Sequence, residues 1–187
     1  LNCNIKCNEA TFDIMGMAAT DFPEMPSVSN NNAVSIDGKI FSDMVKGSIF
    51  AAAQTEGARP ILTGINISVT GGELQVVAID GYRLAIRKQA VNVANDLNFT
   101  VSARAVGEVI RLIEEQTEAI EISVGERLIS FNVDGYLFIS RLFEGDFVNY
   151  RKTIPEGHKQ TVTVNTRDLI NTIERVSLLI SESFSTP

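Results

Sequence analysis

Hydrophobic and polar residues alternate along residues 59–88 in the way that is typical of three consecutive β-strands. The apolar runs that predict these strands are 61–69, 74–79 and 82–86. Gly71-Gly72 and Asp80-Gly81 separate the runs and are typical of hairpin turns. A three-stranded sheet of this kind has one face to bury, so a neighbouring element has to cover it.

A short strand and a helix are predicted just before this sheet, and the same order then recurs along the chain. The first strand covers 34–36, and apolar residues at helical spacing predict a helix near 38–54. The second copy consists of a strand at 99–101, a helix near 103–115 and strands at 119–124, 128–133 and 136–141. A third copy begins with a strand at 162–164 and a further helix.

The three copies align without gaps at the residues that begin the helices. Asp37, Ser102 and Asn165 are the predicted N-caps, at intervals of 65 and 63 residues. An apolar residue follows each cap by four positions and another by eight. These residues are Phe41, Val106 and Leu169, then Val45, Ile110 and Ile173. Internal repetition of this kind predicts an α+β fold of tandem βαβββ units, in which two units form one domain and two helices pack under antiparallel sheets.

Composition excludes several classes of protein. The chain is 44% hydrophobic and 21% charged, which is ordinary for a globular protein, and no apolar run approaches the ~18 residues of a membrane span. Cys3 and Cys7 would lie on one face of a strand roughly 13 Å apart, so we expect buried free thiols in a reducing cytoplasm. With His158 as the single histidine, neither a zinc site nor a cysteine–histidine nucleophile is expected, and no cofactor is predicted.

The net charge of −7 argues against tight nucleic-acid binding unless the cations are clustered. They are clustered in the repeat. Lys39, Arg104 and Arg167 each follow a cap by two residues, and Lys46 and Arg111 lie seven residues further on, on the same helix face. A cation in the first helical turn opposes the helix dipole at a cost of about 0.3–1 kcal/mol, so its recurrence suggests a shared partner for this face. The alternative is ordinary solvated helix surface, which Glu108 between the two arginines supports.

The sequence Asp-Gly-Tyr-Arg at residues 80–83 allows two interpretations. Asp80 and Arg83 form a polar pair beside Tyr82 that could belong to an enzyme site. The simpler interpretation is a hairpin turn, because the second unit repeats the turn at Asp134-Gly135 without the arginine.

Three motifs in order, RPILTG, VAIDGYRLA and EGDFVNYRKTIP, resemble the bacterial DNA polymerase sliding clamp, the beta subunit of the replicative polymerase. The resemblance extends over most of the chain. It implies a non-catalytic processivity factor, in which helices line the hole of a homodimeric ring through which duplex DNA passes. An acidic exterior is compatible with such a ring, because topology holds the DNA. The DNA-facing residues would be Lys39, Lys46, Arg104, Arg111 and Arg167.

The resemblance also implies a division of the chain into three clamp domains. Residues 1–26 would be the last strands of a first domain, 33–156 a complete middle domain, and 159–187 the start of a third. The chain, which has no initiating methionine, is expected to be a fragment of a longer protein.

Clamps of this family bind a short hydrophobic peptide motif of their partners in a groove between the second and third domains. The matching positions here are Leu62, Ile79, Gly81, Tyr82, Arg83, Leu84, Val148, Lys152, Thr153 and Phe184. Val148 and Lys152 stand where some members have proline and arginine, and most of the third-domain wall would lie beyond Pro187. The implied partners are the polymerase catalytic subunit, the clamp loader and other proteins with this motif, in the cytoplasm and away from any membrane. The alternative function is a repeat scaffold that binds peptides and not DNA.

Overall fold

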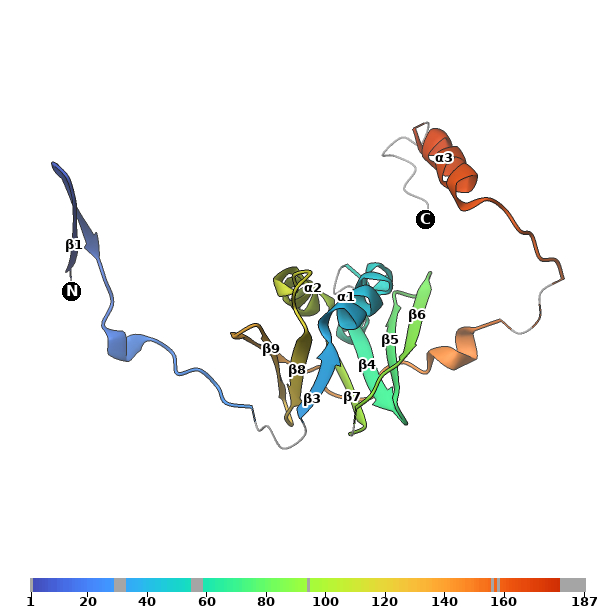
Figure 1. Cartoon of the computed structure of the whole chain (residues 1–187), viewed down its shortest axis with the longest axis horizontal. Coiled ribbons are helices and arrows are strands. Elements are labelled where there is room, and N and C mark those ends of the chain that lie inside the picture. Colours follow the sequence, from blue (N-terminus) through green and yellow to red (C-terminus); the bar gives the residue numbers. More distant parts are fainter. Residues whose placement is uncertain are drawn as a thin grey trace.

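The computed structural model describes residues 2–28, 33–54, 59–93, 95–155, 157 and 159–178. A compact domain lies between two extended arms, which carry the first hairpin and the last helix (Figure 1). None of the helices in these residues is both long and apolar enough to cross a membrane.

The compact domain consists of two βαβββ units. The first unit contains β3 (Ala33–Asp37), α1 (Gly38–Lys46), β4 (Gly64–Thr70), β5 (Glu73–Ile79) and β6 (Leu84–Ala90). The second unit contains β7 (Leu97–Ser102), α2 (Ala103–Leu112), β8 (Ala119–Val124), β9 (Leu128–Val133) and β10 (Tyr136–Arg141). The predicted order of elements is therefore confirmed for both units.

The two units exchange their first strands. One sheet has the order β6-β5-β4-β7 and the other β10-β9-β8-β3, with all neighbours antiparallel. Strand β3 thus completes the sheet of the second unit, where Val34 pairs with Ile122. Strand β7 completes the sheet of the first unit, where Val101 pairs with Ile65. Each four-stranded sheet thus consists of three strands of one unit and the first strand of the other.

Both helices lie side by side on one side of the strands, as the repeat predicts (Figure 1). Their apolar stripes are buried in one core that both sheets share. The buried members of these stripes are Phe41, Met44, Val45, Val106 and Val109. Phe41 of α1 meets Phe131 of β9, with ring centroids 6.2 Å apart and a tilt of 49°, so an aromatic pair joins the two units.

Side-chain hydrogen bonds explain where α1 begins and why it ends earlier than predicted. The carboxylate of Asp37 accepts a hydrogen bond of 2.8 Å from the amide of Ile40, whereas Ser102 occupies the cap position of α2 without a side-chain bond. Helix α1 ends at Lys46 and not near residue 54. The hydroxyl of Ser48 donates a hydrogen bond of 2.7 Å to the carbonyl of Met44. In a longer helix this carbonyl would accept the backbone amide of residue 48 instead. A 3₁₀ turn, η3 (Ile49–Ala51), follows.

The first strand of the 59–88 stretch also begins later than predicted. Residues 61–63 belong to the 3₁₀ turn η4 (Pro60–Thr63), because Pro60 is preorganised for the first turn of a helix, and β4 starts at Gly64.

The two arms confirm some predictions and correct others. Strands β1 (Asn2–Cys7) and β2 (Ala10–Met15) form a hairpin, but both cysteines are exposed free thiols and not buried ones, because none of the described residues forms a second layer over this hairpin. A 3₁₀ turn, η1 (Ala19–Asp21), follows. In the other arm, α3 (Thr166–Ser177) begins at Asn165 as predicted. Residues 162–164 are not in a strand, since no strand among the described residues pairs with them.

Candidate functional site

The predicted cationic face is found on α1 and α2. Lys39 and Lys46 lie one heptad apart on α1, and Arg104 and Arg111 lie one heptad apart on α2. All four side chains are exposed. Arg167 is also exposed, but it lies on α3 in the C-terminal arm, so four of the five predicted cations lie on the two neighbouring helices.

Each helix borders a separate hollow that contains two of these cations. Lys39 and Lys46 line a hollow of about 480 Å³ between α1 and the residues after α2, together with Asp43, Glu114 and Glu115. Because acidic side chains share the hollow, cations do not dominate it.

The second hollow, of about 540 Å³, lies beside α2. Arg104, Arg111 and the exposed ring of Phe50 line it. The guanidinium of Arg111 is 2.9 Å from the carboxylate of Glu108, and both side chains are largely exposed, so this ion pair contributes little to stability. A phosphate that approaches Arg111 would compete with Glu108.

A further cation belongs to this side of the domain and was missed in the sequence. Alternation along β6 places Ala85 and Arg87 on the helix side of the sheet. A Cβ atom at Gly47 would lie 3.2 Å from the Cδ and Nε atoms of Arg87, so this exposed arginine lies along the end of α1 next to Lys46. The apolar Ala85 two residues earlier is the sequence signal that could have identified Arg87, because alternation places both residues on the same face of the strand.

Asp80 organises the turn between β5 and β6. Its Oδ1 atom accepts hydrogen bonds of 3.0 Å from the amides of Tyr82 and Arg83, and its Oδ2 atom accepts one of 2.9 Å from Nε of Arg83. Burial favours the neutral acid, but these donors outweigh it and lower the pKa of Asp80 below its usual value of 3.8. Residues 82 and 83, which the sequence assigned to a strand, are therefore held in the turn and β6 begins at Leu84.

Six of the predicted peptide-binding residues lie at one end of the first sheet, where β5 ends and β6 begins. Ile79 is buried and pairs with Leu84, which is half-buried. Leu62 lies in η4, just before β4, and its carbonyl accepts a hydrogen bond from Ala53. Gly81, Tyr82 and Arg83 are exposed in the turn, Tyr82 to 87%. Phe184 lies outside the described residues, as does His158.

The outer face of this sheet, away from the helices, is partly covered. Val77 is fully buried but does not belong to the core beneath the helices, whereas its neighbours Val76 and Ala78 do. Strand alternation therefore places Gln75, Val77 and Ile79 on the outer face.

The connecting segment, residues 142–155, crosses this outer face. The amide of Gln75 donates a hydrogen bond of 2.6 Å to the hydroxyl of Tyr150 in the 3₁₀ turn η5 (Tyr150–Thr153). Val148, which is half-buried, precedes this turn, while Lys152 and Thr153 are exposed within it. The segment crosses β5 about four residues, roughly 13 Å, from Ile79, so the two groups of predicted residues border the outer face from different directions.

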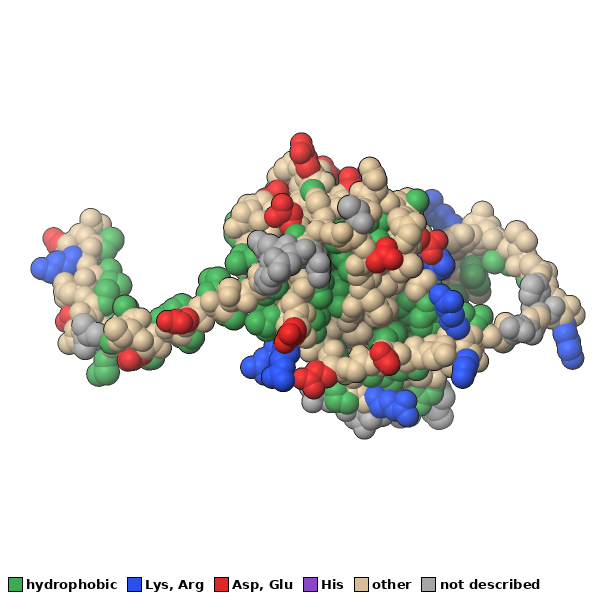
Figure 2. Space-filling view, turned by 90° about the horizontal axis from the view of Figure 1, so that it is seen from below, with side chains coloured by type: hydrophobic (Ala, Val, Ile, Leu, Met, Phe, Trp, Pro, Cys, Tyr) green, Lys and Arg blue, Asp and Glu red, His purple; other side chains and the backbone are tan. Residues whose placement is uncertain are grey.

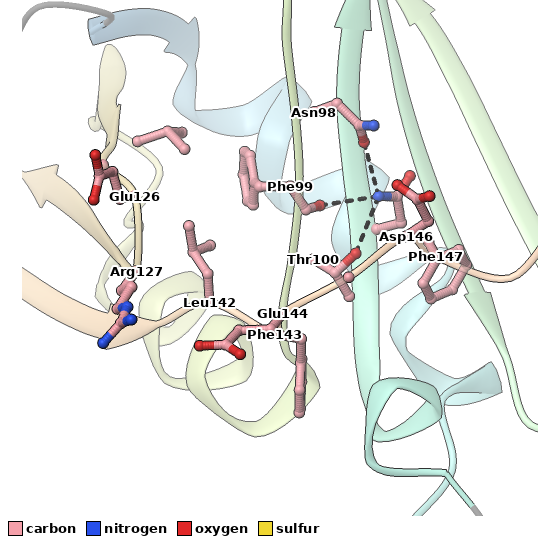
Figure 3. A pocket seen from close by; sticks show the side chains of 14 residues that line it. Asn98, Phe99, Thr100, Glu126, Arg127, Leu142, Phe143, Glu144, Asp146 and Phe147 are labelled. Carbon is pink, nitrogen blue, oxygen red and sulfur yellow. Dashed lines mark hydrogen bonds between the residues drawn. The ribbon is translucent and has the colours of Figure 1, made fainter.

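The first part of the connecting segment closes a hollow of about 540 Å³ that the sequence did not predict (Figure 3). The amide of Phe143 donates to the carbonyl of Thr100, and the amide of Leu142 to that of Arg127, both at 2.9 Å, so the segment bridges the two sheets. Asn66 also lines the hollow, and its Nδ2 donates hydrogen bonds to oxygens of Asn98, Phe99 and Thr100.

The face away from the helices carries charges of both signs. Figure 2 shows this side of the molecule, with acidic and basic side chains over the compact domain and apolar side chains along the N-terminal arm.

Comparison with known proteins agrees with this architecture. Residues 35–149 match the family model of the DNA polymerase III beta subunit, central domain. The chain belongs to this family. It is 30% identical over 180 residues to the beta sliding clamp of Bacillus subtilis, an alignment that covers 95% of this chain and 47% of that protein. The beta sliding clamp of Halalkalibacterium halodurans is 30% identical over 182 residues, covering 95% and 48%.

Solved structures of the family have the same fold. The DNA polymerase sliding clamp from Bacillus subtilis superposes with a TM-score of 0.89 at 29% identity, covering 97% of this chain and 48% of that one. The sliding clamp from Pseudomonas aeruginosa bound to griselimycin has a TM-score of 0.86 at 26% identity, covering 98% and 50%. The chain spans about half the length of the curated relatives it matches.

Proposed function

We propose that the chain is the central part of a sliding-clamp subunit, a non-catalytic processivity factor that encircles duplex DNA in the cytoplasm as a homodimeric ring. Residues 1–26 are then the end of the first domain, 33–156 the second domain and 159–187 the start of the third. The observation that carries this proposal is the placement of α1 and α2 side by side, with two cations at matching positions of each.

The apolar stripe of α3 supports the domain assignment. Leu169 and Ile173 match the stripe positions of α1 and α2 but are 46% and 58% exposed. In α1 the corresponding residues, Phe41 and Val45, are completely buried. An exposed apolar stripe of this kind is typical of a helix that packs against a sheet. In the proposed third domain, α3 would pack against the strands of that domain.

Mixed charge on the helix face is compatible with a clamp. A ring that is closed around DNA does not need a high affinity for phosphate, so carboxylates such as Asp43 and Glu108 among the cations are tolerated. The same carboxylates favour the alternative function, a scaffold that binds partner peptides without DNA.

Retention on DNA separates the two functions. The full-length protein is loaded onto nicked circular DNA and onto the same DNA after linearisation, and the bound fraction is followed during gel filtration at increasing salt. A clamp stays on the circle and slides off the linear molecule. A peptide-binding scaffold is retained on neither, and equal retention on both indicates ordinary electrostatic binding.

We further propose that the partners, among them the polymerase catalytic subunit and the clamp loader, bind at the outer face bordered by Ile79, Leu84 and Val148. An apolar face with an arginine at its rim suits a short hydrophobic peptide. Arg83→Ala or Leu84→Ala in the full-length protein should weaken binding of a peptide containing Gln-Leu and Leu-Phe by about tenfold if these are hot-spot residues. Unchanged affinity in both variants, measured by isothermal titration, would place the peptide site elsewhere.

A further inference from the structure

The Asp-Gly-Tyr triplet occurs once in each unit but forms two different turns. In the second unit Asp134 and Gly135 alone connect β9 to β10, with φ angles of 47° and 87°, which is a two-residue turn that favours glycine. In the first unit the last ladder pair is Ile79 with Leu84, so residues 80–83 all lie outside the ladder. The first turn is therefore wider, and it contains the exposed Tyr82 and Arg83.

The two aspartates account for this difference. The carboxylate of Asp80 remains within its own turn, where it accepts the amides of Tyr82 and Arg83 and the Nε–H group of Arg83. The carboxylate of Asp134 instead leaves its turn and accepts a hydrogen bond of 2.5 Å from the hydroxyl of Thr117. Position 83 corresponds to Leu137 in the second unit, which offers no charged donor.

We propose that Asp80 is a positioning residue that holds Arg83 ready for a bound peptide. This inference rests on the proposed peptide-binding function. The Asp80 side chain is 14% exposed and that of Arg83 52% exposed, so the carboxylate is the fixed partner and the guanidinium is the accessible one. The Nη1 and Nη2 groups of Arg83 have no acceptor among the residues that the structure describes. They are free to donate to a main-chain carbonyl or carboxylate oxygen of a short apolar peptide.

Preordering explains why such an arrangement strengthens binding. A free arginine side chain on a surface loses rotamer freedom when a ligand immobilises it, and this loss opposes binding. The bond between Asp80 and Nε of Arg83 restricts the side chain before the peptide arrives. Asp80 thus acts on the peptide only through Arg83.

A double-mutant cycle tests this role. Asp80→Asn keeps a side-chain oxygen that can accept the two amides of the turn, but its amide nitrogen cannot accept a bond from Nε of Arg83. Isothermal titration of the full-length protein with a peptide containing Gln-Leu and Leu-Phe compares wild type, Asp80→Asn, Arg83→Ala and the double variant. We expect about a tenfold loss for Arg83→Ala, about a three- to tenfold loss for Asp80→Asn, and no further loss in the double variant.

Asp134→Asn is the matched control, since it changes the same residue type in the corresponding turn of the other unit. It should leave the peptide affinity at the wild-type value, and thermal melts of every variant show whether the domain is folded. Wild-type affinity for Asp80→Asn, or losses that add in the double variant, would overturn the positioning role while leaving the peptide site intact. If the wild-type protein does not bind the peptide, the proposed site and this inference both fail.

Discussion

The side-chain amide of Gln75 donates a 2.6 Å hydrogen bond to the hydroxyl of Tyr150, which lies 75 residues later in the chain. This bond attaches the connecting segment to the middle of β5 and keeps it over the outer face of the first sheet. Val77, next to Gln75 on this face, is buried from solvent although it faces away from the helices.

Tyr150→Phe removes this hydrogen bond and preserves the ring. The expected result is a loss of about 0.5–1.5 kcal/mol in the free energy of unfolding, because the partly buried amide of Gln75 loses its acceptor. Urea denaturation provides the measurement. Tyr136→Phe is the control, since Tyr136 is 63% exposed, and a similar loss there would show that the effect does not come from the contact with Gln75.

Gly64→Ala tests how closely the connecting segment packs on the sheet. A Cβ atom at residue 64 would lie 2.8 Å from both the ring of Phe143 and the carbonyl oxygen of Val101, which is shorter than van der Waals contact. We expect a destabilisation of about 1–3 kcal/mol in urea denaturation, because the backbone contact cannot relax freely.

Gly107→Ala is the matched control for this substitution. Gly107 lies inside α2, where the nearest atom to a new Cβ is 3.7 Å away, on Ile49. Alanine should stabilise the helix there by up to about 1 kcal/mol. Stabilisation by both substitutions would contradict the close packing of Phe143 on Gly64.

Acidification should remove the contribution of Asp80 to stability. Because the pKa of Asp80 is lower in the folded chain than its usual value of 3.8, its ionised form stabilises the fold above that value. The contribution is lost as the pH falls through the lower, folded pKa. Wild type should therefore be more stable than Asp80→Asn near neutral pH, and the difference should shrink below pH 3.8. A difference in unfolding free energy that does not change with pH would contradict this assignment.

Reversal of the helix charges tests the proposed DNA-facing surface in the proposed full-length ring. Lys39, Lys46, Arg104 and Arg111 are changed together to Glu. We expect faster loss from circular DNA and a smaller dependence on salt, by up to about 0.9 in the logarithmic slope for each phosphate contact removed. The free energy of unfolding should change little, because all four side chains are exposed.

A second set of four exposed cations supplies the control for this charge change. Arg127, Arg141, Arg151 and Lys159 lie outside the two helices and can be changed to Glu in the same way. Retention should then stay near the wild-type value. Equal losses in the two variants would indicate a general effect of net charge.

The repeat made most of the domain predictable. Alternation and helical spacing gave the bounds of β8, β9 and β10, and the two aligned copies predicted the buried helix stripes, of which only Ile110 is half-buried. Local hydrogen bonds were harder to anticipate. The hydroxyl of Ser48 makes a hydrogen bond at the end of α1. The carboxylate of Asp80 holds a wide turn and Asp134 lies in a narrow one, although the same Asp-Gly-Tyr triplet occurs at both places.

The contacts of the connecting segment could not be predicted from periodicity. The segment has no regular strand or helix pattern, and its position depends on single contacts such as Gln75 with Tyr150 and Phe143 with Gly64. The first part of this segment, residues 142–147, lines the hollow in Figure 3, which was missed for the same reason. The exchange of β3 and β7 was also missed, because a linear repeat does not show which copy each strand joins.

That exchange has a consequence for how the domain is made. Val34 pairs with Ile122, and Ile65 pairs with Val101. Neither sheet is therefore complete until residues far apart in the sequence have come into contact. High contact order of this kind slows folding, because the entropy of closing a long loop is lost before the contacts form. During synthesis on the ribosome, the apolar side chains of β3 therefore remain without their partner until the second unit has emerged. The two units are then expected to acquire their native structure together, in a single cooperative step.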